Sequence, residues 1–198
     1  MYTVFRRWRQ AGVWERVHAA SREQCLLAAG KNRKPTVSII DSHSVRTAEG
    51  GFHRGYDAGK KITGRKRHLA VDTLGLVWAV LVHPADWQDF IESVPLLARQ
   101  YLACRRLKVV FADGAYKCGG LPEWLGTNFG WLLQPVLRPV QLRGFPVLPQ
   151  WWIIERNFAW ISRHRRHACV YERKPENSEA LIQLAMVGLM PLRLERSI

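Results

Sequence analysis

Two stretches of the chain share a pattern, a short apolar run that ends in an aspartate. The first, VSIID, ends at Asp41, and the second, KVVFAD, ends at Asp113 and is followed by Gly114. Apolar runs of this length that are rich in β-branched residues predict buried strands. A carboxylate at the end of a buried strand needs a partner, because an unpaired buried charge is costly. Asp41 and Asp113 are therefore candidate functional residues.

The pattern elsewhere predicts a hairpin, a last strand and several helices. Strand-like runs flank a turn at Leu74-Gly75, and apolar residues recur at helical spacing in other segments. Asp86 is expected to cap the helix after the hairpin, and Pro191 to end the last helix. The expected elements are two helices within 1–30, the hairpin over 68–84, helices over 86–101 and 120–128, a strand over 131–134, an extended proline-containing connection over 135–149, and helices over 152–167 and 177–190. Their order predicts a single α/β domain with helices packed on a mixed sheet.

A third acid lies on the helix expected over 152–167. Ile154, Phe158 and Ile161 form one stripe, which should face the sheet, and Glu155 lies on the adjacent stripe. Glu155 is thus at the border of the buried face, where it could reach a metal held by the two strand-end aspartates. The alternative is that Glu155 pairs with a nearby arginine.

Three carboxylates without a Cys/His cluster point to Mg²⁺ or Mn²⁺ rather than zinc. Two such ions, about 3.5–4 Å apart, would clamp the attacking and leaving oxygens of a phosphoryl transfer. Asp72, next to the hairpin turn, is the main rival ligand, although an acid in that position is expected to be solvated. Ser42 and Ser44 lie near Asp41, but no nucleophile-elbow motif surrounds them.

The charge of the chain predicts a polyanionic partner. The formal net charge is +14, from 30 Lys+Arg against 16 Asp+Glu, and such an excess favours binding to nucleic acid. The alternative is a protein that only tolerates its charge. The glycine-rich cationic segment 50–68 predicts a flexible loop along a phosphate backbone, and the helix over 152–167 adds further cations. The candidate DNA-binding residues are Arg54, Lys60, Lys61, Arg65, Lys66, Arg67, Arg156, Arg163, Arg165 and Arg166.

Three arginines near the N-terminus leave two possibilities open. Arg6, Arg7 and Arg9 interleave with the apolar residues of the first expected helix. They form either a DNA-contacting surface or a solvated face.

The sequence gives no sign of a membrane or of an oxidising compartment. It has no run of about 18 apolar residues that would predict a spanning helix, and its N-terminus lacks the apolar core of a secretory leader. The four cysteines form no CxxC pair, so we expect reduced thiols and a cytoplasmic protein.

Four blocks of the sequence carry a resemblance to a known family. IDSHSVRT, GYDAGKKITGRKRHLAVDTLG, FADGAY and IIERNFAWISRHRR occur in this order. Together they resemble the DDE transposases of bacterial insertion sequences, closest to the group whose last acid lies in an ER-x-F-A-W helix. The match covers about residues 35–192, most of the chain.

The resemblance implies an RNase H-like α/β fold with a mixed five-stranded sheet over 34–193. It implies Mg²⁺-dependent cleavage at the ends of an insertion sequence and transfer of the 3′-hydroxyl ends into target DNA, with Asp41, Asp113 and Glu155 as the three acids. The implied partners are double-stranded DNA, both terminal repeats and target, and a second copy of the chain, in or near the bacterial nucleoid.

The chain also departs from the family's pattern. The helical segment 1–33 stands where family members carry a longer end-binding region, so we expect a truncated copy or one frame of a split gene. Leu148, Trp151 and Ser162 replace the accessory Tyr, Arg and Lys of related transposases. The competing hypotheses are a non-catalytic DNA-binding remnant and a metal-dependent nuclease of the same fold.

Overall fold

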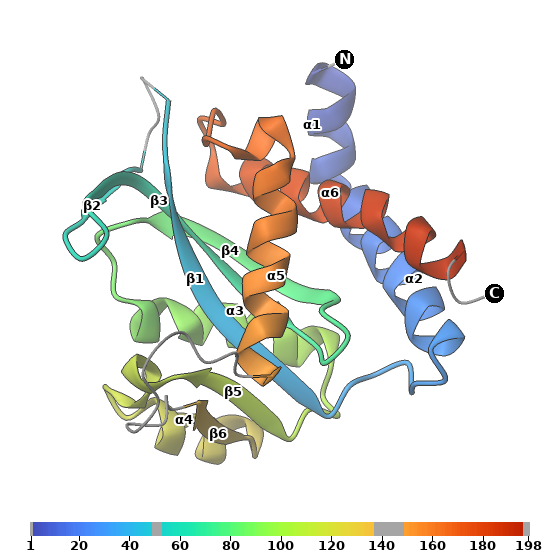
Figure 1. Cartoon of the computed structure of the whole chain (residues 1–198), viewed down its shortest axis with the longest axis vertical. Helices are drawn as coiled ribbons and strands as arrows, with labels where there is room; N and C mark the ends of the chain where they lie inside the picture. The colour runs from blue at the N-terminus through green and yellow to red at the C-terminus, as the bar shows by residue number, and fades with distance from the viewer. Residues whose placement is uncertain (1, 49–52, 137–148, 196–198) are drawn as a thin grey trace.

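A curled mixed sheet with helices on both faces forms the molecule (Figure 1). The computed structural model describes residues 2–48, 53–136 and 149–195. The strands are β1 (Val37–Arg46), β2 (Gly55–Asp57), β3 (Ile62–Val71), β4 (Val77–Pro84), β5 (Val109–Asp113) and β6 (Leu132–Val136). Their order is β2-β3-β1-β5-β6, and β4 also pairs with β3. The predicted α/β, RNase H-like fold class is confirmed, with short β2 as a sixth strand.

The strand β1 lies at the centre and has a different type of partner on each edge. It pairs antiparallel with β3 from Ile39, opposite Val71, to the end of the strand. On its other edge only the first three residues pair with β5, in parallel, and Ile39 lies opposite Phe111. Strand β5 in turn pairs in parallel with β6. Beyond Ile39 no strand of the described sheet pairs with the β5-facing edge of β1, and at its far end the Arg46 carbonyl accepts from the Val170 amide at 2.8 Å.

The helices form two layers. They are α1 (Tyr2–Gln10), α2 (Val13–Ala28), α3 (Asp89–Ala103), α4 (Leu121–Phe129), α5 (Pro149–Arg163) and α6 (Pro175–Glu195), with short 3-10 helices at Gly114–Lys117 and Arg165–His167. Helices α2, α5 and α6 share a core cluster with Ile39 and Leu69. Helices α3 and α4 share the other with Ile40 and Ala70. Successive strand residues point to opposite faces, and this alternation builds both layers.

The N-terminal segment forms the two predicted helices. Gly12, with φ 65°, separates them. Helix α2 packs on α6, where the Cys25 thiol donates to the Met190 carbonyl at 3.7 Å, and Arg22 donates to the Val77 carbonyl at 2.9 Å. This helix thus shares the main core, while the boundary between 1–33 and 34–193 stays a prediction. No helix in the described residues is long and apolar enough to span a membrane.

Several predicted boundaries are wrong. Strand β1 continues five residues past Asp41, because Ser42 and Ser44 are buried and alternate with the half-buried Asp41 and His43 instead of ending the strand. Strand β3 begins at Ile62, so the second half of the expected cationic loop is a strand. Part of that loop, 50–52, and most of the expected connection, 137–148, lie outside the described residues.

Two predicted helix signals are also wrong. Helix α3 begins at Asp89 with Gln88 as its N-cap, so Asp86 does not cap it. Helix α6 continues through Pro191 to Glu195, because a proline near the end of a helix removes only one backbone donor there. The helix expected over 152–167 ends at Arg163 and is followed by the short 3-10 turn.

Candidate active site

Asp41 and Asp113 lie on neighbouring strands, at the point where these strands separate. Ile39 and Phe111 are opposite each other in the last paired positions, and the two aspartates are each two residues further along. Residues two apart in a strand share a face, so both acids lie on the face of Ile39 and Phe111. That face packs against α5. The strand pairing therefore brings the two predicted acids to one end of one face.

The two carboxylates adopt the same local arrangement. Oδ1 of Asp41 accepts a hydrogen bond from the Ser42 amide at 2.7 Å, and Oδ1 of Asp113 accepts one from the Gly114 amide. In each case no hydrogen bond to the second oxygen is seen in the described residues. Asp41 is half-buried and Asp113 is exposed. Each acid thus keeps one oxygen for a ligand.

Burial raises the pKa of Asp41 to about 7. The Ser42 amide and the charge of Lys60 oppose this rise, whereas Asp89 and Asp113 add to it. A nearby negative charge raises a carboxyl pKa only when the two groups are close. Asp41 and Asp113 therefore repel each other, and a cation between them would relieve that repulsion.

Helix α5 brings Glu155 to the same face. The predicted stripe is confirmed, since Ile154, Phe158 and Ile161 are buried against the sheet. The ring of Phe158 lies 5.3 Å from the ring of His43 on β1, and α5 crosses β1 in the same general direction (Figure 1). Glu155 is about one turn before Phe158 in α5, and Asp41 is two residues before His43 in β1. Since Phe158 and His43 are in contact, Glu155 and Asp41 both precede this contact along their elements. Glu155 forms no salt bridge with an arginine in the described residues.

The chemistry of the three acids fits a hard divalent cation, but they do not yet form a metal cage. Carboxylate oxygens are the donors that Mg²⁺ and Mn²⁺ prefer. Within the described residues no group of three His, Cys, Asp or Glu side chains is close enough to hold a metal ion. The two aspartates thus share a face of the sheet that the Glu155 helix covers, and the three acids do not meet at one point.

Asp72, the rival ligand, has a structural role. It is 1% exposed, and the expectation that it is solvated is wrong. Its Oδ1 accepts from the Leu74 and Leu76 amides, both at 2.9 Å, and its Oδ2 accepts from the Trp78 indole at 3.0 Å. These bonds stabilise the β3–β4 turn and leave no oxygen for a metal.

Three of the predicted DNA-binding cations are buried in β3. Arg65 is 0%, Lys66 8% and Arg67 1% exposed. Arg65 donates to the carbonyl oxygens of residues 172 and 173, each at 2.8 Å, and Arg67 donates to that of residue 167 at 2.8 Å. The prediction that these three form part of a flexible DNA-binding loop is wrong, because β3 has partner strands on both edges and helices on both faces.

The remaining predicted cations lie near the surface. Arg54, Lys60, Lys61, Arg163, Arg165 and Arg166 are exposed. Arg166 pairs with Glu172 at 2.8 Å, and the half-buried Arg156 lies 4.6 Å from the centre of the Trp160 ring. The role of these residues in DNA binding stays a prediction.

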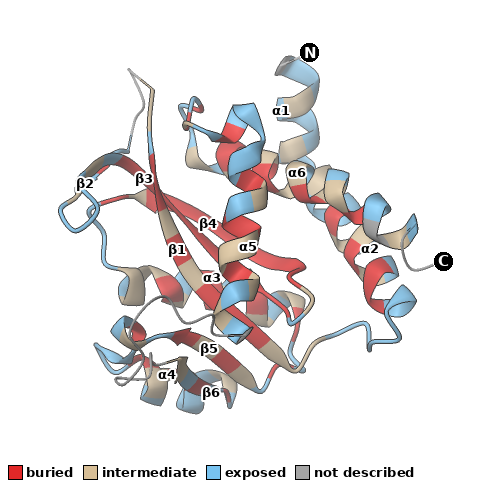
Figure 2. Cartoon of the chain, viewed as in Figure 1, coloured by how far each residue is buried: buried red, intermediate tan, exposed pale blue. Residues whose placement is uncertain are grey.

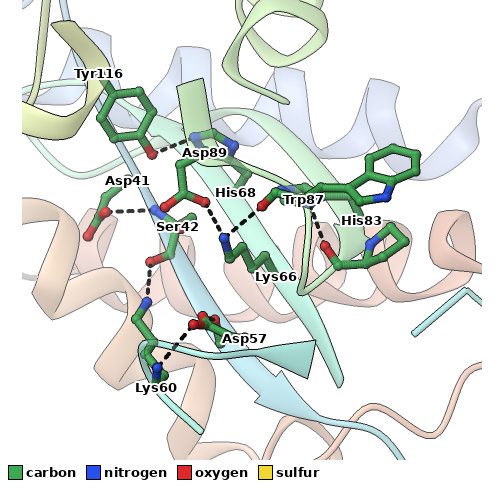
Figure 3. A network of polar contacts seen from close by, with 12 residues as sticks. Asp41, Ser42, Asp57, Lys60, Lys66, His68, His83, Trp87, Asp89 and Tyr116 are labelled. Atoms are coloured by element: carbon green, nitrogen blue, oxygen red, sulfur yellow. Dashed lines mark hydrogen bonds and ion pairs between the residues drawn. The ribbon is translucent and has the colours of Figure 1, made fainter. Parts of the chain in front are cut away.

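A polar network beside Asp41 was missed by sequence reasoning (Figure 3). The Tyr116 hydroxyl lies 2.8 Å from Nε2 of His68, and Lys66 pairs with Asp89 at 2.9 Å. Tyr116 follows Asp113 by three residues, which is a signal that could have been used. Asp89 carried no such signal, because its place beside Asp41 depends on how α3 docks onto the sheet.

The comparisons with known proteins identify the family of the chain. No curated protein matches the chain. A family model described as the transposase DDE domain matches residues 32–190, a range that includes all three candidate acids and every strand. The chain therefore belongs to the transposase DDE domain family.

Proposed function

We propose that this protein is a DNA transposase that cuts DNA at the ends of an insertion sequence and joins the 3′-hydroxyl ends to target DNA. One observation carries the proposal. The strand register brings Asp41 and Asp113 side by side on the face that α5 covers, and α5 carries Glu155. Membership of the family gives the general function, and this placement supports the proposal that the three acids carry it out.

The acids would hold Mg²⁺ or Mn²⁺. A bound divalent ion neutralises charge on the phosphate and makes water or a hydroxyl group more acidic. Asp41 and Asp113 would each offer their free Oδ2, and Glu155 would complete the set. The serines are not alternatives as nucleophiles, since Ser42 and Ser44 are buried and Ser44 donates to Asp57 at 2.5 Å.

Double-stranded DNA would bind across the acid end of the sheet. The exposed Arg54, Lys60 and Lys61 lie in and beside the β2–β3 turn, and Arg163, Arg165 and Arg166 lie at the end of α5. Each cation that contacts a phosphate releases counterions and strengthens binding. Two copies of the chain would hold the two DNA ends together.

Strand transfer with purified protein tests the proposal. The reaction uses supercoiled plasmid and short duplexes with the terminal sequences of the insertion sequence, in Mn²⁺, with Asp41→Asn, Asp113→Asn and Glu155→Gln in parallel. We expect joined products from the wild type and a loss of at least ~100-fold in each variant, with DNA binding retained.

Other outcomes would favour the competing hypotheses. Nicked plasmid without joined products would indicate a nuclease. DNA binding without any metal-dependent product would indicate a non-catalytic remnant. Full activity in all three variants would refute the assignment of the acids.

A further inference from the structure

The turn between β2 and β3 fixes the position of Lys60. The carboxylate of Asp57 accepts from the Lys60 amide at 3.0 Å and from the Ser44 hydroxyl at 2.5 Å, which links the turn to β1. Lys61 follows with a φ of 54°. A positive φ is uncommon for a residue other than glycine and is often found at functional sites. The backbone around Lys60 is therefore ordered before any ligand binds.

The side chain of Lys60 extends from this turn toward Asp41 (Figure 3). Its Nζ lies 3.4 Å from the carbonyl oxygen of Ser42. Its charge opposes the rise that burial causes in the pKa of Asp41, and it adds to the fall that burial causes in the pKa of His43. The ammonium group therefore lies at the acid end of β1.

The ammonium group of Lys60 has unused donors. It can donate three hydrogen bonds, and a bond of 3.4 Å to Ser42 is long for its type. Lys60 forms no salt bridge within the described parts of the chain. Lys66 is different, because it pairs with Asp89 at 2.9 Å and donates to the Trp87 carbonyl at 2.8 Å.

Lys61 is a natural control for Lys60. It has the same charge, is the next residue in the chain and is exposed. No hydrogen bond or salt bridge of its side chain is seen where the structure is described. A general charge effect on DNA binding should involve both lysines, whereas a contact at the acid site should involve Lys60 alone.

From this geometry we propose that Lys60 binds the scissile phosphate, its ammonium group donating to a non-bridging oxygen of the phosphodiester that lies against Asp41. The inference rests on the proposed function, since it takes Asp41 as part of the active site. The compact ammonium group suits a single oxygen, because lysine acts as a point charge where arginine would bind two oxygens. The phosphate oxygen would replace the weak bond to Ser42.

A binding experiment without metal tests this contact independently of cleavage. The probes are duplexes with the terminal sequences of the insertion sequence, each carrying one methylphosphonate, which removes the charge of one phosphate. We expect wild type and Lys61→Ala to lose ~10-fold or more in affinity when the modification is at the cleavage junction. Lys60→Ala should bind the modified and unmodified duplexes equally. A loss in Lys60→Ala as large as that in the wild type would overturn the inference.

A cleavage experiment in Mn²⁺ gives the second readout. Lys60→Ala should reduce the rate by ~10- to 100-fold, Lys61→Ala by less than ~5-fold, and Lys60→Arg should restore part of the loss. Equal melting temperatures of the variants would show that the turn is intact. If the wild type cuts and the two alanine variants have equal rates, the inference fails while the proposed function stands. If the wild type does not cut, the proposed function fails, and the binding experiment still decides the contact.

Discussion

Two groups of cations lie within eight residues of each other in this chain and have opposite environments. Lys60 and Lys61 are exposed in the β2–β3 turn, whereas Arg65, Lys66 and Arg67 are buried in β3. In Figure 2, β3 is buried along most of its length, and the turn before it is exposed. Both groups are short runs of lysine or arginine, so the sequence alone does not distinguish them. The net charge of a sequence therefore predicts a positive electrostatic potential around the protein. Which cations reach the surface depends on whether their strand is paired and covered in the fold.

Each buried cation of β3 has acceptors that offset its burial. The guanidinium groups of Arg65 and Arg67 donate to carbonyl oxygens of residues 167, 172 and 173. A buried charge is tolerated when it is paired and hydrogen-bonded. These bonds also hold the segment between α5 and α6 against the sheet. Cations that were expected to lie in a DNA-binding loop therefore connect β3 to this segment.

The largest expected loss of stability follows from removal of the Arg67 side chain. Arg67→Ala should lower the free energy of unfolding by ~3 kcal/mol or more, because it leaves a cavity and an unpaired carbonyl group at residue 167. Urea unfolding measures this, with Lys61→Ala as the control. A loss below ~1 kcal/mol would show that burial of this cation contributes little.

Asp41 is a half-buried acid that has no salt bridge within the described residues. Its folded pKa of about 7 exceeds the ordinary 3.8, so between these values the folded state holds a proton that the unfolded state has lost. Stability of the metal-free protein should therefore fall as pH rises through this window and level off above it. Asp41→Asn should remove this fall and stabilise the metal-free protein at pH 8, by up to ~4 kcal/mol.

Thermal unfolding of the two proteins between pH 4 and 8 measures this difference. Parallel stability curves would contradict the raised pKa. Addition of Mn²⁺ should stabilise the wild type and not the variant, by ~2.7 kcal/mol when the ion is at 100 times its dissociation constant.

The Lys66–Asp89 pair should show an intermediate effect. Lys66→Met leaves Asp89 without its ion partner, and Asp89→Leu leaves Lys66 without its ion partner. We expect a coupling energy of ~1–2 kcal/mol from the double-mutant cycle, with the double variant more stable than the sum of the single losses predicts. Strictly additive losses in urea unfolding would show that the pair is only a proximity of two independent groups.

The smallest effect belongs to Lys61. Lys61→Ala should change the free energy of unfolding by less than ~0.5 kcal/mol. If Lys61 contacts a phosphate, the slope of log affinity for duplex DNA against log salt should become less steep by ~0.9. An unchanged slope would place Lys61 outside the DNA-binding surface.

The parts of the fold that follow from local pattern could be predicted from the sequence. The two apolar runs gave the positions of β1 and β5, although β1 continues past Asp41 to Arg46, and the stripe of Ile154 and Phe158 gave the buried side of α5. Burial of Arg67 could not be predicted, because its acceptor is a hundred residues away in the chain. The same holds for Asp89, whose place beside Asp41 is set by tertiary packing.

The candidate site was predictable to the same extent. Strand register places Asp41 and Asp113 on one face of the sheet, and helix periodicity gives the buried stripe of α5 beside which Glu155 lies. How closely the three carboxylates approach depends on the docking of α5 across β1, which no local pattern specifies. The contacts of Tyr116 with His68 and of Lys60 with Ser42 depend in the same way on tertiary packing.

The short strand β6 has a consequence for association between molecules. In the described sheet it is the edge strand next to β5, and its Leu132 is 59% exposed. An apolar edge of this kind can recruit a strand from another molecule and start sheet-to-sheet aggregation. Pro135, paired with Ala112, has no amide hydrogen to offer such a strand, and proline is a common means of blunting an edge. The position of this one residue therefore helps a highly charged protein to remain unaggregated while its sheet assembles.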